Sequence, residues 1–206
     1  MTTTLRPHDL LWLGAQDALE GVTEPWVAEI WHAGLPVVVR RDVAQNGRIP
    51  VGVRGLRRDQ RAAGWVKPEQ VIRVVSPEQL VAPQELPRSP FISQPPVQLA
   101  LQLAQFAWPW IWGITGSTGY ALATSIPVIH ATSDLDVLIR APEPLSTRDL
   151  ARWQQQLSGG LCRADTQVET PNGGFALAEW LRDGRVMLKT NHGPRLVSDP
   201  WQREDS

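Results

Sequence analysis

The chain of 206 residues has one cysteine, two lysines and no long apolar run. The single Cys162 excludes an intramolecular disulfide framework and a zinc site built on cysteines, and we interpret it as an inert buried thiol. No apolar run approaches the ~18 residues that a membrane-spanning helix needs, and no signal segment precedes the first motifs. We therefore expect a cytoplasmic protein with no membrane partner.

An excess of charge is also missing, because 20 basic and 21 acidic residues give a net charge of −1. A protein that coats nucleic acid would be basic overall, so we expect no nucleic acid polymer as a partner. All basic residues other than Lys67 and Lys189 are arginines. The guanidinium group suits bidentate recognition of phosphate, which a locally basic cleft would use.

The apolar share of 42% and the charged share of 20% are typical of a soluble globular protein. The first part of the chain is predicted to be a small α+β domain, which we place at residues 1–82. It has one expected helix at 24–33. Apolar runs bounded by turn signals predict three strands, at residues 36–41, 49–54 and 71–75.

Six prolines fall between residues 76 and 96. This density is typical of an extended connector, which we place at 83–96. The remaining residues, 97–206, alternate expected helices and strands, as in an α+β (α/β) domain with a mixed sheet and flanking helices. Helices are predicted at 97–106, 116–123, 146–157 and 174–181. Strands are predicted at 110–113, 134–140, 163–169 and 185–190.

Two aspartates one residue apart, Asp134 and Asp136, form the most informative motif. Residues two apart on a strand share a face, so both carboxylates would converge while Leu135, Val137 and Ile139 pack on the other face. Like charges held together need a cation, and Mg²⁺ prefers oxygen ligands. An Asp-x-Asp motif alone is also common at solvated strand edges. With its neighbours, it predicts catalytic aspartates that bind one or two magnesium ions.

A third carboxylate would complete such a metal site. Strand alternation places Asp165, Gln167 and Glu169 on one face of the expected strand at 163–169. If that face meets the Asp134 and Asp136 face, Asp165 becomes the third metal ligand and a catalytic residue that helps to deprotonate a hydroxyl nucleophile. Glu169 is the alternative for this position.

The pair Gly116-Ser117 at an expected helix start predicts a phosphate-binding site. Gly116 lets the backbone approach a phosphate without a Cβ clash, and Ser117 adds a hydroxyl donor. The new helix also offers free N–H groups and the positive end of its dipole. A Gly-Ser pair alone is usually an ordinary turn, so the prediction depends on the aspartates that follow.

The order Gly-Ser, Asp-x-Asp and a third acid resembles the nucleotidyltransferase superfamily. Sixteen residues separate Ser117 from Asp134, which is longer than usual in that superfamily. A closer resemblance covers nearly the whole chain, and the long spacer is normal in it. Its segments are 6–13 (RPHDLLWL), 52–55 (GVRG), 115–124 (TGSTGYALAT), 133–136 (SDLD), 169–180 (ETPNGGFALAEW), 188–190 (LKT) and 193–197 (GPRLV). Together they are similar to the phosphoribosyl-dephospho-CoA transferases, the holo-acyl-carrier-protein synthases of malonate decarboxylase.

This resemblance implies a nucleotidyltransferase-like fold in the second domain and a defined reaction. The substrate would be 2′-(5″-triphosphoribosyl)-3′-dephospho-CoA. A serine of the apo acyl-carrier subunit of malonate decarboxylase would attack its α-phosphate, and pyrophosphate would leave. Two alternatives are a different acceptor, such as the citrate lyase carrier or a small molecule, and a binding module without catalysis.

Basic residues in two places are further candidates for substrate binding. Arg54 and Arg58, beside the strand at 49–54, would clamp phosphates of the CoA portion or meet an acidic carrier. Lys189 and Arg195, around the last strand, would contact the triphosphate. The alternative in both places is a set of solvated surface cations.

Overall fold

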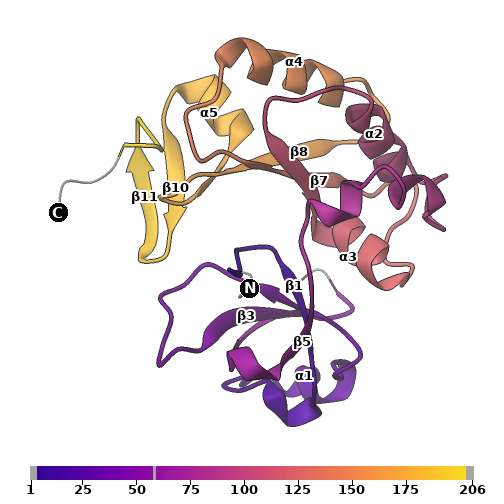
Figure 1. Cartoon of the computed structure of the whole chain (residues 1–206), viewed down its shortest axis with the longest axis vertical. Coiled ribbons are helices and arrows are strands. Elements are labelled where there is room, and N and C mark those ends of the chain that lie inside the picture. The colour runs from indigo at the N-terminus through magenta and orange to yellow at the C-terminus, as the bar shows by residue number, and fades with distance from the viewer. Residues whose placement is uncertain (1–3, 58, 203–206) are drawn as a thin grey trace. The chain divides into compact units, whose positions relative to one another are not determined.

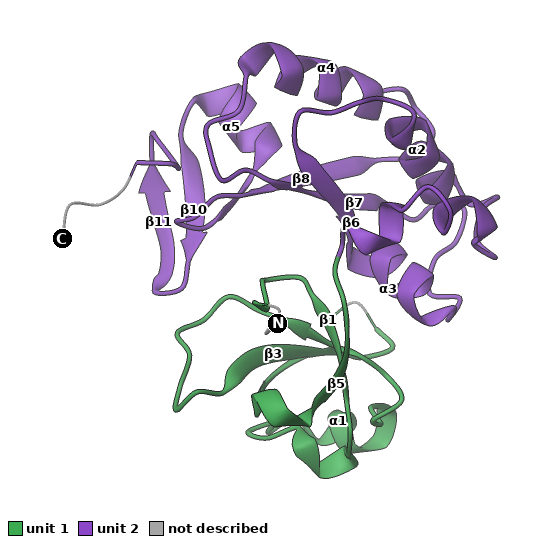
Figure 2. Cartoon of the chain, viewed as in Figure 1, with its two compact units in different colours: residues 1–76 green, residues 77–206 purple. Residues whose placement is uncertain are grey.

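The computed structural model describes residues 4–57 and 59–202, which form two compact units, Met1–Ser76 and Pro77–Ser206 (Figure 2). Both units combine helices with a sheet, so the predicted α+β class is confirmed. No helix in these described ranges is long and apolar enough to cross a membrane.

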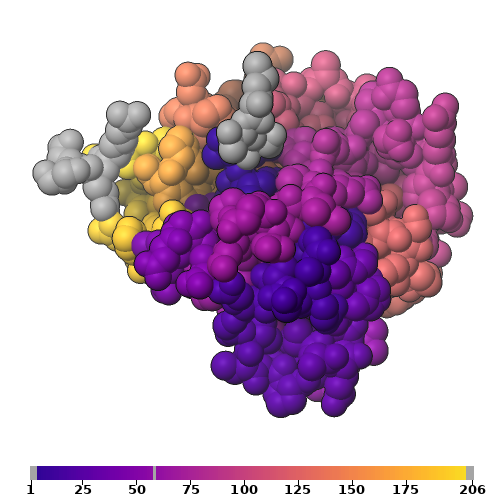
Figure 3. Space-filling model, turned by 60° about the horizontal axis from the view of Figure 1, so that its bottom comes forward, coloured from indigo at the N-terminus to yellow at the C-terminus, as the bar shows by residue number. Residues whose placement is uncertain are grey.

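The first unit is a five-stranded antiparallel sheet in the order β4-β3-β2-β1-β5. Its strands are β1 Leu10–Leu13, β2 Val37–Val39, β3 Ile49–Arg54, β4 Arg61–Val66 and β5 Val71–Val75. One α-helix and two 3-10 helices accompany the sheet: α1 Pro25–Ile30, η1 Gln16–Ala18 and η2 Pro68–Gln70. The inward side chains of β1, β2, β3 and β4 form the core of this unit together with residues of η1 and α1. Figure 3 shows the outer surface of this unit in indigo to magenta.

The strands expected at 36–41, 49–54 and 71–75 are confirmed, but β1 and β4 were not predicted as strands. The β4 segment, Arg61–Val66, has a weak strand signal. Its inward residues Ala62 and Gly64 are too small to give an alternating pattern. A Cβ on Gly64 would lie 2.9 Å from the side chains of Leu19 and Val22, so the small residue admits that segment. The alternating hydrophobic pattern of β4 is therefore weak because the neighbouring segment requires small residues on its inward face.

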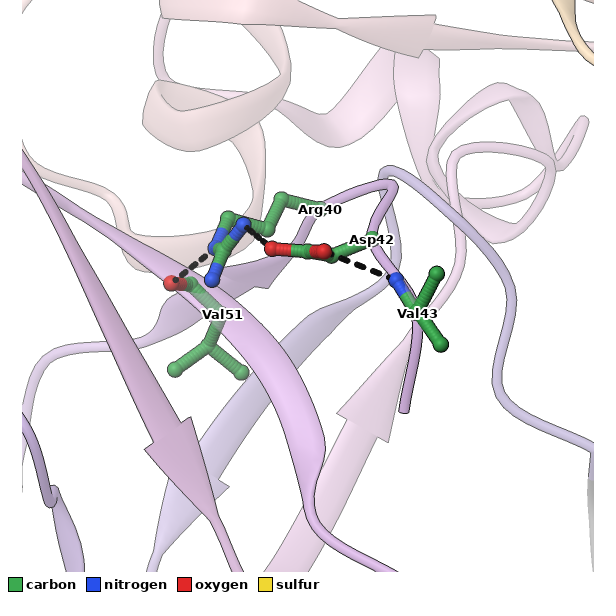
Figure 4. A network of polar contacts seen from close by, with 4 residues as sticks. All are labelled: Arg40, Asp42, Val43 and Val51. Carbon is green, nitrogen blue, oxygen red and sulfur yellow. Dashed lines mark hydrogen bonds and ion pairs between the residues drawn. The ribbon is translucent and has the colours of Figure 1, made fainter. Parts of the chain in front are cut away.

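An ion pair secures the turn between β2 and β3 (Figure 4). Arg40 pairs with Asp42, and its Nε donates to the Val51 carbonyl at 3.2 Å. The backbone N–H of Val43 donates to the same carboxylate at 2.8 Å. The hydrogen bond from Arg40 lowers the pKa of the Asp42 carboxyl below its ordinary value. The guanidinium also lies over the Trp65 ring, 5.1 Å from its centroid, which couples this turn to β4.

The second unit is a six-stranded mixed sheet in the order β11-β10-β9-β8-β7-β6. The strands are β6 Ile111–Thr115, β7 Leu135–Arg140, β8 Ala164–Glu169, β9 Gly174–Ala176, β10 Val186–Thr190 and β11 Gly193–Val197. The helices are α2 Pro95–Ala104, α3 Gly116–Thr124, α4 Thr147–Leu157 and α5 Leu177–Asp183, with 3-10 helices η3 Gln79–Val81 and η4 Leu86–Arg88.

Helices α2, α4 and α5 lie over one face of this sheet and form the core with it (Figure 1). Trp153 of α4 is fully buried, and its indole N–H donates to the Thr166 hydroxyl of β8 at 2.9 Å. The start of α4 is as predicted, because the Ser146 hydroxyl accepts a hydrogen bond from the Asp149 backbone N–H. Because these helices cover one face of the sheet, side chains on its other face are the candidates for a functional site.

Three segments of the second unit differ from the sequence expectation. The segment expected to be an extended connector, 83–96, contains η4 and the start of α2, and its Leu86 is buried in the core. Residues 174–176 form β9, so the helix expected at 174–181 begins at Leu177. Strand β11 was not predicted, because Pro194 and Arg195 are poor strand signals. A single antiparallel partner at the sheet edge is enough to hold it.

Candidate active site

The register of the sheet brings two of the predicted carboxylates side by side. Strand β7 pairs with β8 in parallel, with Asp136 opposite Asp165. Paired residues of neighbouring strands share a face, so both side chains lie on the face opposite α2, α4 and α5. The intervening Leu135, Val137 and Ile139 are buried in the helix-covered core, as predicted. Asp134 lies one residue before β7, so the strand expected at 134–140 begins at Leu135.

The same register separates the two candidates for the third acid. Glu169 lies opposite Arg140, four residues along β8 from Asp165, which is roughly 13 Å. Its side chain is buried, with a relative exposure of 7%, and accepts a hydrogen bond from Gln167 Nε2 at 2.6 Å. The Asp165 side chain is 54% exposed. Asp165 is therefore the carboxylate that stands next to Asp136 and in contact with solvent.

Gly116 contacts the Asp136 carboxylate directly. Its φ of +62° is in the left-handed region, and a Cβ at this position would overlap Oδ2 of Asp136. Both features require glycine. Strand β6 pairs with β7 so that Thr115 lies opposite Asp136, and α3 begins at the next residue. The first turn of a nine-residue helix is thus held against the carboxylate.

Two threonine hydroxyls fix this arrangement. The Thr118 hydroxyl, fully buried in α3, donates to the Asp134 carbonyl at 3.3 Å, and the Thr115 hydroxyl donates to the Asp136 carbonyl at 3.5 Å. Ser117 is half-buried at the second position of α3. The helix start and the Asp-x-Asp segment are therefore one structural unit, in which the N-terminus of α3 lies beside the Asp136 carboxylate.

Cys162 lies in the turn before β8 and is half-buried. Burial raises the pKa of its thiol, and the nearby Asp134 charge raises it further. A thiol with a raised pKa stays protonated near neutral pH and is a poor nucleophile. The carboxylate and hydroxyl groups, and not this thiol, are therefore the candidate reactive groups of the site.

The donor set fits magnesium in its chemistry, since carboxylate oxygens are the ligands that this ion prefers. Asp136 and Asp165 stand on adjacent strands, and Asp134 is two residues from Asp136. Within the described ranges, however, no three His, Cys, Asp or Glu side chains come together as a ready metal site. Asp165 is 3.4 Å from the Arg163 guanidinium, and both side chains are largely exposed. An exposed pair of this kind is worth little and is easily exchanged for a stronger cation.

The structure separates the predicted basic residues. Lys189 lies opposite Gly174, which lies opposite Glu169, so Lys189 is on the same face as Asp136. Two strands and four residues put its Cα roughly 16 Å from that of Asp165. Arg195 lies opposite Leu188, which points into the helix-covered core, and is therefore on the other face.

The basic candidates of the first unit are Arg54 and Arg58. Arg54 ends β3 opposite Arg61 of β4, and it is half-buried. Arg58 lies outside the described residues. Arg57 beside it pairs with Asp59 at 2.9 Å, and both side chains are highly exposed.

Sequence reasoning missed an ion pair on the face that carries Asp136. Arg140 Nε is 2.6 Å from Glu78 Oε1, with side-chain exposures of 10% and 15%. The Pro77 carbonyl accepts from the Ile114 N–H at 3.1 Å, and Pro77 packs where Gly113 has no side chain. Strand alternation from Asp136 would have placed Arg140 on this face. No sequence signal identified Glu78 as its partner.

Comparisons with known proteins give the family. Residues 6–77 match the model of the phosphoribosyl-dephospho-CoA transferase MdcG N-terminal domain, and residues 84–200 match that of its C-terminal domain. A phosphoribosyl-dephospho-CoA transferase of Klebsiella pneumoniae (strain 342) is 62% identical over the full length of both chains. One from Azotobacter vinelandii is 42% identical over 96% of this chain and 94% of its own.

A relative with the same name from Pseudomonas putida is 42% identical over 95% of each chain. No solved structure matches the chain. Two family models in the expected order and full-length relatives lead to one conclusion: the chain belongs to the phosphoribosyl-dephospho-CoA transferase family, and it is a transferase.

Proposed function

We propose that this transferase loads the apo acyl-carrier subunit of malonate decarboxylase with its prosthetic group. The donor is 2′-(5″-triphosphoribosyl)-3′-dephospho-CoA. The carrier serine oxygen bonds to the α-phosphorus, the bond from that phosphorus to the α–β bridging oxygen breaks, and pyrophosphate leaves. The observation that carries the proposal is the register of Asp136 with Asp165 beside the Gly116 helix start, in a chain of this family.

Each residue has a physical task in this reaction. The start of α3, with the Ser117 hydroxyl, binds the phosphates that become pyrophosphate, because the N-terminus of a helix is the positive end of its dipole. The absence of a Cβ at Gly116 leaves room for the Asp136 carboxylate against this helix start. Asp165, exposed and next to Asp136, accepts the proton of the carrier hydroxyl.

Asp136 and Asp165, with Asp134, would hold one or two Mg²⁺ ions. When bound, magnesium neutralises negative charge on the α-phosphate and on the leaving group. Without a cation, the aspartates would repel the triphosphate, since like charges at short distance are unfavourable. Lys189, on the same face but farther away, would meet a part of the donor or the carrier remote from the triphosphate.

The direct test mixes the enzyme, apo carrier, donor and Mg²⁺, and follows the intact mass of the carrier and the release of pyrophosphate. Asp134→Ala with Asp136→Ala should abolish both signals. Glu143→Ala, which removes an exposed carboxylate in the loop after β7, is the matched control and should keep them. Full transfer by the double aspartate variant would overturn the assignment of the site.

The acceptor and the ion are tested in the same assay. Replacing the malonate decarboxylase carrier by the citrate lyase carrier should reduce the rate of transfer, and equal rates would contradict the proposed acceptor. Removing divalent ions with EDTA should stop transfer, and added Mg²⁺ should restore it. Unchanged transfer in EDTA would exclude the magnesium proposal.

A further inference from the structure

The hairpin of β10 and β11 carries a small exposed apolar patch on the face that bears Asp136. Met187 lies opposite Leu196, and antiparallel partners point to the same side of a sheet. Alternation along β10 places Met187 on the side of Lys189, which the pairing with Gly174 assigns to the Asp136 face. Both apolar side chains are exposed, Met187 to 43% and Leu196 to 60%.

Side-chain hydrogen bonds fix the turn of the hairpin. The Thr190 hydroxyl donates to the Gly193 carbonyl at 2.8 Å and accepts from the His192 N–H at 3.1 Å. A Cβ on Gly173 would lie 2.5 Å from the Lys189 carbonyl, so the preceding turn packs closely on β10. The hairpin forms one edge of the sheet, and β6 forms the other (Figure 2). The pairing of Met187 with Leu196 holds the two apolar side chains next to each other.

A cation lies beside the patch. Lys189 is on the same face as Met187 and Leu196, whereas Arg195 is on the other face, and residues 185–197 contain no carboxylate. A small apolar patch beside a cation is complementary to an acidic protein surface with an apolar residue at its centre. The same cation would attract such a partner before contact.

The patch is close enough to the carboxylates to belong to the same encounter. Met187 is two strands and two residues from Asp165, which corresponds to roughly 12 Å between their Cα atoms. A standard protein interface covers about 800 Å² on each partner, so the width of such an interface exceeds this distance. A serine presented to Asp165 on a folded carrier must therefore bring neighbouring carrier surface over the hairpin.

We propose that the β10–β11 hairpin, through Met187, Leu196 and Lys189, is the docking surface for the acyl-carrier subunit, which meets it with an acidic face. This inference rests on the proposed function, because it names the surface that receives the acceptor. The molecule that binds this surface is the apo carrier. The test must exclude binding of a second copy of this chain or of the donor nucleotide at the same surface.

The test measures binding of apo carrier to the enzyme without donor, and then transfer with donor. The double variant Met187→Ser with Leu196→Ser should weaken carrier binding and raise the KM for carrier by about 10-fold or more, as loss of central apolar contacts does. The kcat at saturating carrier and the KM for donor should stay unchanged. Lys189→Gln should weaken binding less and reduce its dependence on salt.

Leu181→Ser is the matched control, because Leu181 is also 43% exposed but lies on α5, over the other face. It should leave carrier binding unchanged. The inference is overturned if the double variant binds carrier as tightly as the wild type, if Leu181→Ser weakens binding equally, or if the double variant changes self-association or the KM for donor instead. Failure of the proposed function gives a different result, since the wild type would then bind carrier without loading it.

Discussion

The two ends of strands β7 and β8 carry charged side chains on the same face of one sheet. The two ends differ in how far these side chains are buried and paired within the protein. At the far end, Arg140 has a buried ion-pair partner in Glu78, and Glu169 is buried with a hydrogen bond from Gln167. At the near end, Asp165 is exposed beside Asp136, and the backbone of Gly116 is held against the Asp136 carboxylate. Charge that the protein satisfies internally supports the structure, whereas charge in contact with solvent is available for a ligand.

The largest expected effect separates these two ends by activity. Asp136→Asn keeps the shape of the side chain and removes its charge, so transfer should fall by about 10³-fold or more, comparable to the loss of a central electrostatic group. Glu169→Gln makes the same chemical change at the other end and should retain most of the activity. Initial rates of carrier loading measure both. Equal losses would contradict the comparison.

The next largest expected effect is on stability, where a substitution at the far end of the strands should cost more than one at the near end. Glu78→Leu leaves Arg140 in a site where its side chain is 10% exposed, and breaking a buried pair in this way costs about 3–5 kcal/mol in the free energy of unfolding. Asp165→Asn should change stability by less than about 1 kcal/mol, because its pair with Arg163 is exposed. Urea unfolding measures both variants. A double variant of Glu78→Leu with Arg140→Met should recover much of the loss.

A smaller structural change tests the contact between Gly116 and Asp136. Gly116 and Gly184 have nearly equal φ angles, +62° and +63°, and nothing lies within 4 Å of a Cβ at Gly184. Alanine should cost about 1–2 kcal/mol of backbone strain at either position. Only Gly116→Ala should also displace the Asp136 carboxylate and abolish transfer. Thermal unfolding and loading assays of the two variants separate strain from displacement.

The smallest effect concerns the pair of Arg40 and Asp42. Its exposure lies between that of the buried pair of Arg140 and Glu78 and that of the exposed pair of Arg163 and Asp165. Hydrogen bonding from Arg40 lowers the pKa of Asp42 in the folded state. Its stabilisation is therefore present above the unfolded pKa of about 3.9 and is lost as the pH falls through the lower folded pKa. Asp42→Asn should cost up to about 1 kcal/mol at pH 7, with the difference from wild type vanishing in acid. Asp183→Asn, at a pair that is more exposed, is the comparison: its pKa is also lowered, by the hydrogen bond from Arg182, so its pH dependence should have the same direction and a smaller amplitude.

Much of the fold followed from local patterns in the sequence. Leu135, Val137 and Ile139 defined a buried strand face, and Ser146 with Asp149 defined the start of α4. Strand β4 did not follow, because its small inward residues give a pattern only when the segment at Leu19 and Val22 packs on them. Strand β11 did not follow either, because it depends on one neighbouring strand at the sheet edge.

The sequence by itself determined the kinds of residue at the candidate site: paired aspartates, a Gly-Ser helix start and an acidic strand. It favoured Asp165 as the third acid and kept Glu169 as the alternative, because alternation places both on one face. Only the tertiary structure separated them, since the register of β8 against β7 sets Asp165 beside Asp136 and Glu169 beside Arg140. Register depends on pairing between segments distant in the chain, so no local pattern contains it. The packing of Pro77 against β6, also a contact distant in sequence, gave Arg140 its partner Glu78, 62 residues away.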